Sequence, residues 1–287
     1  MKTLGYYNGK YDLIENMTIP MNDRACYFGD GVYDAAFSRN NVIFALDEHI
    51  DRFFNSAGLL RIKIPYTKDE LKTLLIDMVK KVDAVEQFVY WQVTRGTAMR
   101  DNVFPGDDVK ANIWITLEPW NIEYKQQKLK LITLEDTRFL HCNIKTLTLL
   151  PSVMAAQKAD EKDCQEAVFH RGDRVTECAH SNVSIIKDGI FKTAPADNLI
   201  LPGIARAHII KMCKKFEIPV NETPFTLEEL MDADEVIVTS SGQFCMTTCE
   251  IDGTPVGGKA PEIVKKLQDA LSAEFLKETD KVQEGII

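Results

Sequence analysis

The sequence contains little that would suit a metal site, a nucleic-acid surface or a membrane span. Its 287 residues include only five histidines, and none stands at the spacing of a helical zinc pair. The net charge is -9 at pH 7, and no basic cluster is present that could follow a phosphate backbone. No apolar run is long enough to cross a bilayer, and the first residues lack a signal-peptide pattern. These absences predict a cytoplasmic protein that binds neither nucleic acid nor membrane.

The cysteines also lack the pattern of a disulfide scaffold. There are seven, an odd and scattered set, so reduced thiols are expected. Two pairs have the residue types of metal ligands: Cys178 with His180, and Cys245 with Cys249. Cysteines packed in a core are more common than such ligands, and we predict no metal site.

Patterning in the N-terminal half predicts a small α/β domain. An Asn-Gly pair between two short aromatic-rich runs predicts a hairpin at the start. Asp47 is expected to cap a helix whose apolar residues recur at helical spacing, with Arg52 outside that apolar stripe. Thr67 and Glu70 form the capping box of a second helix.

The C-terminal half is predicted to be larger and rich in strands, with flanking helices. We place the boundary at Glu118–Asn121, which gives domains of residues 1–119 and 120–287 and a mixed α+β fold class. Gly203 precedes a helix whose first backbone amides could bind an anion. A strand ending near Thr239 leads into Ser240 and Ser241.

Lys145 is the candidate for chemistry. It lies in Asn143–Leu150 among apolar neighbours, with no acid nearby in sequence. Burial disfavours the charged form of an amine, so such a lysine can be a nucleophile or form a Schiff base at neutral pH. The alternative is a lysine that lays its stem on apolar neighbours and keeps its ammonium in water.

Three other features of the sequence would bind a cofactor that reacts with an amine. Glu177 supplies a carboxylate on a predicted strand, Gly203 marks a helix N-terminus, and Ser240 and Ser241 supply hydroxyls. Pyridoxal 5'-phosphate would use all of them: the amine for its aldehyde, the carboxylate for its ring nitrogen, and the helix end and hydroxyls for its phosphate.

The order of motifs along the chain resembles that of the class IV pyridoxal-phosphate aminotransferases. Singly the motifs are weak, and in this order they are specific: Phe28–Tyr33, His49–Arg52, Thr94–Thr97, Asn143–Lys145, Val175–Glu177 with Ser181–Val183, and Leu201–Ile204. Within the family the chain looks most like the D-amino acid aminotransferases. That resemblance covers nearly the whole sequence and implies a two-domain fold of type IV.

The resemblance implies roles for the cofactor-binding residues. Lys145 would form the Schiff base and Glu177 would hold the pyridine nitrogen. The phosphate would be bound by Arg52, the backbone of Ile204 and Ala205, and Ser241, while Leu201 would lie against the ring.

The resemblance also implies the substrate side. Tyr33 and Arg100 match positions that receive the substrate carboxylate, with the Arg100 loop coming from a second subunit of a homodimer. The implied reaction is transamination between a D-amino acid, of the D-alanine or D-glutamate type, and a 2-oxo acid. Three alternatives stay open: a branched-chain L-amino acid aminotransferase, an elimination like that of aminodeoxychorismate lyase, and cofactor binding without turnover.

Three positions depart from the family pattern. Asn102 stands where a histidine is expected near Arg100, which removes a charged donor from the carboxylate site. Ala205 replaces a threonine hydroxyl beside the phosphate. His180 stands where the family has a small residue and could reshape the substrate side.

Overall fold

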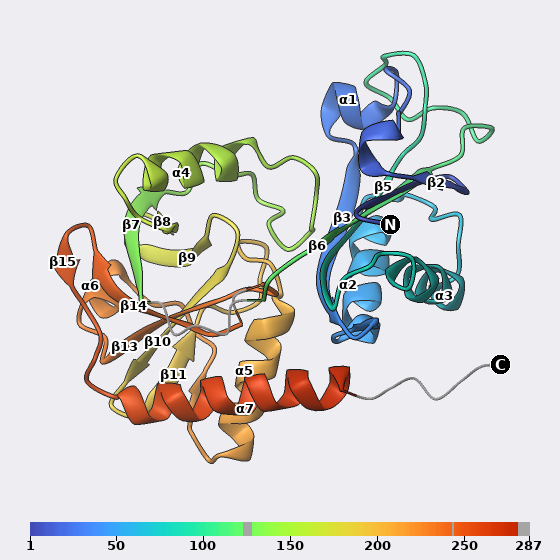
Figure 1. Cartoon of the computed structure of the whole chain (residues 1–287). Helices are drawn as coiled ribbons and strands as arrows, with labels where there is room; N and C mark the ends of the chain where they lie inside the picture. The colour runs from blue at the N-terminus through green and yellow to red at the C-terminus, as the bar shows by residue number, and fades with distance from the viewer. Residues whose placement is uncertain (123–127, 243, 281–287) are drawn as a thin grey trace. The chain divides into compact units, whose positions relative to one another are not determined.

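The computed structural model describes residues 1–122, 128–242 and 244–280, and has the mixed α+β character expected from the sequence (Figure 1). Contacts divide the chain into two compact units. Unit 1 comprises Met1–Ile122, Ile144–Thr148 and Phe275–Ile287, and unit 2 comprises Glu123–Asn143 and Leu149–Glu274.

These units differ from a single cut after residue 119. Ile144–Thr148 belongs with unit 1 because its backbone is bonded there: Tyr33 N donates to Lys145 O over 3.0 Å, and Leu147 N donates to Gly31 O over 3.1 Å. The end of the last helix also joins unit 1, where Glu278 accepts from the backbone of Ala45. The division into domains at residue 119 stays a prediction.

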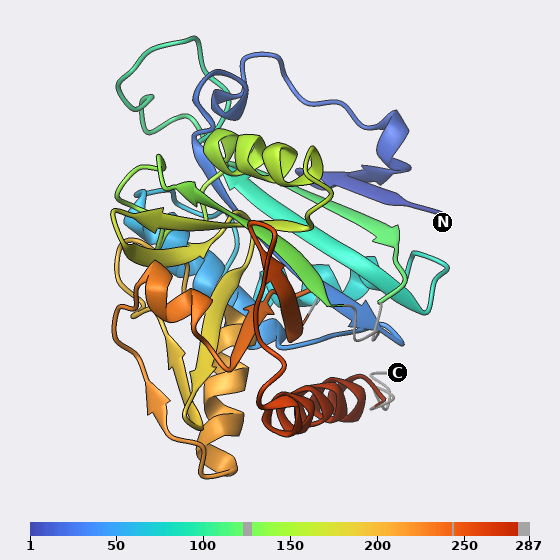
Figure 2. The ribbon, with the colours of Figure 1, turned by 90° about the vertical axis from the view of Figure 1, so that its left-hand side faces the viewer.

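Unit 1 is built on a six-stranded sheet in the order β2-β1-β6-β5-β3-β4, in which every pairing is antiparallel. Its strands are β1 (Leu4–Tyr7), β2 (Lys10–Asp12), β3 (Gly31–Arg39), β4 (Val42–Ile43), β5 (Glu86–Thr94) and β6 (Asn112–Pro119). Figure 2 shows β5 and β6 side by side in this sheet. The predicted hairpin is confirmed, with Asn8 and Gly9 at φ of 45° and 93°. The segment Glu118–Asn121, where the domain boundary was predicted, is partly strand, since β6 continues to Pro119.

Unit 1 contains the helices α1 (Arg24–Phe28), α2 (Leu46–Leu59) and α3 (Lys68–Val79), the short 3-10 helix η1 (Ile14–Asn16) and the end of the last helix. Apolar side chains of α2 and α3 share one core with those of the sheet. The capping box of Thr67 and Glu70 is confirmed at the start of α3. Asp47 as the cap of α2 is wrong, because the helix begins one residue before it, after Ala45 in a left-handed conformation. Asp47 lies in the first turn and pairs with Lys72.

Unit 2 contains a nine-stranded sheet in the order β12-β11-β10-β13-β14-β7-β8-β9, with β15 paired to β14. Pairings β14–β7, β7–β8 and β11–β12 are parallel and the others antiparallel. The strands are β7 (Leu129–Glu135), β8 (Glu166–Arg171), β9 (Arg174–Cys178), β10 (Asn182–Lys187), β11 (Ile190–Thr193), β12 (Val220–Asn221), β13 (Glu235–Thr239), β14 (Met246–Ile251) and β15 (Thr254–Pro255).

The helices of this half are α4 (Leu150–Asp160), α5 (Ile204–Lys215), α6 (Leu227–Met231) and α7 (Pro261–Thr279). Pro151 lies in the first turn of α4, where its missing N–H costs no helical bond. Thr226 and Glu229 form the capping box of α6. No helix within the described ranges is long and apolar enough to cross a membrane.

Candidate active site

Lys145 is fixed on both sides of its backbone. Its carbonyl accepts from Tyr33 N on β3, and its own N–H donates to Ser56 Oγ on α2 over 3.2 Å. The half-buried side chain places Nζ 4.3 Å from the centroid of the Tyr33 ring. An ammonium over an aromatic face is stabilised without a counter-ion, so the amine is held close to Tyr33.

A buried ionic group lies on α2 and β3 in the same unit. Arg52 donates through Nε and Nη2 to both oxygens of Asp34, at 2.9 and 2.7 Å. His49 Nδ1 lies 2.8 Å from Asp34 Oδ1. Arg52 was expected to lie outside the buried stripe of its helix, and it is instead buried with an exposed fraction of 8%. Asp34 makes this burial possible because it pairs with the guanidinium.

The pKa values in this group are set by burial and by the opposing charges. Burial raises the pKa of Asp34, but Arg52 and His49 outweigh it and hold that pKa below its ordinary value. Burial lowers the pKa of His49, and the positive charges of Arg52 and Lys145 lower it further, against the opposite effect of Asp34. Asp34 is therefore ionised and His49 is neutral at neutral pH.

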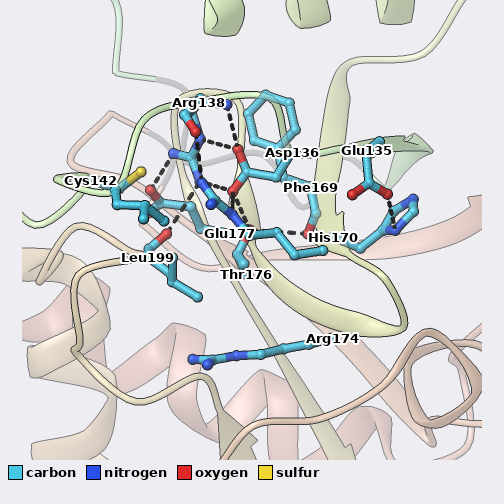
Figure 3. A network of polar contacts seen from close by, with 12 residues as sticks. Glu135, Asp136, Arg138, Cys142, Phe169, His170, Arg174, Thr176, Glu177 and Leu199 are labelled. Atoms are coloured by element: carbon cyan, nitrogen blue, oxygen red, sulfur yellow. Dashed lines mark hydrogen bonds and ion pairs between the residues drawn. The ribbon is translucent and has the colours of Figure 1, made fainter.

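In unit 2, Glu177 on β9 is buried, and both of its oxygens accept hydrogen bonds. Figure 3 shows the contact with Arg138. Oε1 accepts from Arg138 Nη1 at 2.5 Å. Oε2 accepts from Asn182 Nδ2 and from the backbone N–H of Leu201, each at 2.9 Å. Three donors fix the plane of the carboxylate, and one of them ties it to the peptide of Leu201.

Arg138 is in turn held by Asp136, which follows β7. Nε and Nη2 of Arg138 donate to the two oxygens of Asp136 at 2.9 and 3.0 Å. Asp136 also accepts from Arg171 Nε at 3.1 Å and from Thr176 Oγ1 at 3.2 Å. Burial raises the pKa of Asp136, but its bonds to Arg138 outweigh burial, so the pKa lies below its ordinary value. Burial lowers the pKa of Arg138, while Asp136 and Glu177 raise it above its ordinary value.

The start of α5 has the features of an anion site. Its N-cap is Gly203, and no side chain among the described residues caps the helix. Ile204 and Ala205 form the first turn, where backbone N–H groups have no intrahelical partner. Residue 203 also has no room for a side chain, because an ideal Cβ there would lie 2.0 Å from Asn182 Oδ1. Gly203 therefore makes room for the side chain that holds Glu177.

The other candidates for the substrate side have these surroundings. Tyr33 stacks on Tyr90 with ring centroids 5.4 Å apart. Arg100 and Asn102 are exposed, and the Arg100 guanidinium lies 5.1 Å from the Phe28 ring. His180 Nδ1 lies 3.0 Å from Glu166 Oε2, with its side chain 55% exposed.

Two further candidates follow β13. Ser240 and Ser241 are half-buried there.

Arg95 has a different surrounding from the solvated loop charge that is usual for such a residue. Its Nε donates to both oxygens of Asp30 at 3.0 and 2.9 Å, and its guanidinium lies 3.6 Å from the Phe104 ring centroid. Arg95 thus anchors the loop that carries Arg100.

The family model for class IV aminotransferases matches residues 31–251 of the chain. A Listeria monocytogenes serotype 4b (strain F2365) protein named D-alanine aminotransferase is 42% identical over 268 residues, which are 91% of this chain and 92% of that protein. The chain belongs to the class IV aminotransferases. A Staphylococcus epidermidis (strain ATCC 35984) protein with the same name as the Listeria relative is 38% identical to this aminotransferase, covering 92% of this chain and 94% of that one.

The fold of this class IV aminotransferase is shared with more distant relatives. The structure of the branched-chain amino acid aminotransferase from Escherichia coli matches it with a TM-score of 0.88 at 23% identity, over 99% of this chain and 98% of that one. At this identity the likeness shows the fold alone.

Several residues that bond the candidate residues were not singled out from the sequence. Asp34 lies in an apolar run that reads as an ordinary strand, although His49–Arg52 was noted as a motif. Asp136 and Arg138 lie between a strand and a loop, where no periodic pattern marks them. An Asp-x-Arg pair beside a strand end was the only available signal.

Proposed function

We propose that this aminotransferase exchanges the amino group of a D-amino acid with the oxygen of a 2-oxo acid, with D-alanine or D-glutamate as donor. The observation that carries this substrate class is the 42% identity to the Listeria protein named D-alanine aminotransferase, over nine-tenths of both chains. The reaction is balanced, because the donor leaves as its own 2-oxo acid and the acceptor leaves as an amino acid.

We further propose pyridoxal 5'-phosphate as the cofactor. The chemistry of the available groups fits it: an amine at Lys145, a buried guanidinium at Arg52, a fixed carboxylate at Glu177 and the open first turn of α5. When bound, the cofactor supplies an electron sink for the carbanion formed at the substrate Cα.

Two residues would act on protons. Lys145 would hold the cofactor covalently, and its Nζ would then move a proton from the substrate Cα. Glu177 would keep a proton on the pyridine nitrogen, a task that needs an ionised carboxylate in a fixed plane. The three donors to Glu177 support both requirements.

The phosphate would be bound by groups that provide charge and N–H donors. Arg52 would supply charge, the backbone of Ile204 and Ala205 would supply donors, and Ser240 and Ser241 would supply hydroxyls. Ala205 lacks the family threonine hydroxyl, a loss of about 1 kcal/mol that leaves the backbone donors in place. Leu201 would lie against the ring, since its N–H is fixed by Glu177.

The substrate carboxylate would be received by Tyr33 and Arg100, with Asn102 as a neutral donor. His180 would lie on the substrate side, where its pairing with Glu166 fixes one ring nitrogen. We propose that the Arg100 loop contacts the second subunit of a homodimer. Its apolar side chains are exposed, with exposed fractions of 78% for Met99, 66% for Val103 and 47% for Phe104. Exposed apolar groups of this kind mark protein interfaces.

A second apolar surface in unit 2 supports the same homodimer. Leu150, Val153 and Met154 on α4 are exposed at 70%, 59% and 53%. We infer no nucleic-acid partner from the net charge of -9.

The test is a half-reaction screen. The cofactor-loaded enzyme is mixed with single D- and L-amino acids, and conversion of its visible band to that of the amine form is followed. We expect conversion by D-alanine and D-glutamate. Conversion by L-leucine or L-valine alone would replace the proposal with the branched-chain activity, and no conversion by any amino acid would leave the lyase or a binder without turnover.

A further inference from the structure

We propose that Arg138, braced by Asp136, is a positioning residue that fixes the plane and the ionised state of the Glu177 carboxylate. The role of Glu177 toward a pyridine nitrogen rests on the proposed function. The brace itself is a property of unit 2 and can be measured without cofactor.

The guanidinium of Arg138 is fixed along both of its donor edges. One edge, Nε and Nη2, faces the two oxygens of Asp136, and Nη1 reaches Glu177 Oε1 at 2.5 Å (Figure 3). Nη2 also donates to the Leu199 carbonyl at 3.3 Å, and the guanidinium carbon lies 4.6 Å from the Phe169 ring centroid. A planar group held in this way has little freedom to turn, so Oε1 of Glu177 has a fixed partner.

The other oxygen of Glu177 is fixed from different elements. Asn182 on β10 donates to Oε2, and the same side-chain amide also donates to the Leu201 carbonyl at 3.0 Å. The N–H of Leu201 donates to Oε2 as well. Glu177 is thus held at Oε1 by a charge and at Oε2 by two neutral amides.

Arg138 is a cationic partner of Glu177, and two thiols lie near this pair. Burial raises the pKa of the Cys142 thiol to about 11, and it raises that of Cys178 well above the ordinary value, so both thiols are neutral. Arg171 pairs with Asp136 and donates to the Arg138 carbonyl at 2.8 Å. Its guanidinium therefore lies against the brace, and Arg171 serves as a matched control.

The experiment uses the apoprotein with carboxyl-labelled glutamate and follows the carbon NMR signal of Glu177 against pH. Glu177→Gln identifies the signal by its loss. We expect Arg138→Gln to raise the titration midpoint by about one to three pH units, since a carboxylate beside a guanidinium keeps its charge to lower pH. Arg171→Gln should leave the midpoint within about 0.5 pH unit of wild type, because Arg171 bonds Asp136 and the Arg138 carbonyl, and a more distant charge shifts the Glu177 midpoint little. An unchanged midpoint in Arg138→Gln would overturn the proposal.

Two other variants separate charge from orientation. Arg138→Lys keeps a charge without the fork, so its midpoint should lie between those of wild type and Arg138→Gln. Asp136→Asn keeps Arg138 but weakens its brace and should raise the midpoint by a smaller amount. If Arg138→Gln does not fold, as judged by circular dichroism, these two variants decide: a wild-type midpoint in both contradicts the brace.

Binding of pyridoxal 5'-phosphate to the same proteins distinguishes a failure of the proposed function from a failure of the Arg138 proposal. Wild-type protein that does not bind it contradicts the proposed function and leaves the NMR result to decide the brace. If wild type binds, Arg138→Gln should bind about tenfold more weakly, the difference made by one charge-assisted bond. Equal binding by wild type and Arg138→Gln would contradict the positioning role even if the midpoint moves.

Discussion

Gly203 and Asn182 fit together so closely that an ideal Cβ on Gly203 would lie 2.0 Å from Asn182 Oδ1. The φ of Gly203 is -67°, which any residue can adopt, so the glycine is required by space and not by backbone conformation. The amide of Asn182 reaches both Glu177 and the Leu201 carbonyl. A methyl group at residue 203 would therefore disturb Glu177 through Asn182.

Gly203→Ala is expected to lower the free energy of unfolding by about 1–3 kcal/mol, the usual cost of overpacking. It should also weaken binding of pyridoxal 5'-phosphate. Urea unfolding and cofactor titration measure the two effects. Gly58→Ala is the control, because an added Cβ there meets no heavy atom of the described residues within 4 Å. Gly58 lies in α2, so the control should be more stable by about 0.5–1 kcal/mol. Equal stability of the two variants would contradict the close fit.

Asp34→Asn is expected to cost about 3–5 kcal/mol at pH 7, because Arg52 would be left buried without its ion-pair partner. The pKa of Asp34 is lower in the folded protein than in the unfolded chain, where it is about 3.9. Its stabilising contribution is therefore present above about pH 4 and is lost as the pH falls toward the folded value. The stability difference between wild type and variant should narrow below about pH 4.

Denaturant unfolding at several pH values measures the stability difference between wild type and Asp34→Asn. Asp47→Asn is the control, since Asp47 pairs with Lys72 at an exposed position and should change stability by less than about 1 kcal/mol. His49 adds to the acid loss in wild type: its pKa is lowered on folding, so protonation below about pH 6.5 favours the unfolded chain. A difference independent of pH would show that the Asp34 carboxylate does not carry the effect.

Lys145→Ala is expected to abolish covalent attachment of the cofactor. Wild-type protein loaded with pyridoxal 5'-phosphate should be yellow, and borohydride should remove its visible band and leave a mass adduct on the peptide containing Lys145. Lys158→Ala, on the exposed side of α4, should behave like wild type. An adduct that persists in Lys145→Ala would assign the attachment to another amine.

Arg100→Ala is expected to raise the KM for D-alanine by about 10- to 100-fold, since a guanidinium holds a carboxylate by charge-assisted bonds. The steady-state rate at varied D-alanine, with a fixed 2-oxo acid, measures this. Asn102→His, which restores a donor that can be charged, should lower KM relative to wild type. A lower kcat with an unchanged KM in Arg100→Ala would show that Arg100 does not bind the substrate.

Local signals predicted local structure well in this chain. The capping box at Thr67 is confirmed, because its two partners lie within four residues of each other and need no tertiary contact. The start of α2 was wrong because Ala45 adopts a left-handed conformation and its N–H bonds Glu278, more than 200 residues away. Tertiary contacts of this kind leave no signal near the helix.

For the buried charged residues, too, the local features could be predicted from the sequence and the tertiary contacts could not. The lack of an acidic residue near Lys145 could be seen in the sequence, but its contact with the Tyr33 ring could not, because Tyr33 lies on a distant strand. The burial of Arg52 could not be seen, because it depends on Asp34 from a different element. Arg138 was missed for the same reason, since it pairs with Glu177 across 39 residues. The site roles of these residues stay predictions until they are tested.

The membership of Ile144–Thr148 in unit 1 has a consequence for the order of folding. Tyr33 and Lys145 are bonded through their backbones across 112 residues, and the chain end joins the same unit through Glu278. During synthesis, the strands of unit 1 leave the ribosome long before the peptide that carries Lys145, and contacts between such distant segments form slowly. A nascent chain that ends near residue 122 would contain the sheet of unit 1 but not Lys145, so Lys145 reaches its place beside Tyr33 late in folding.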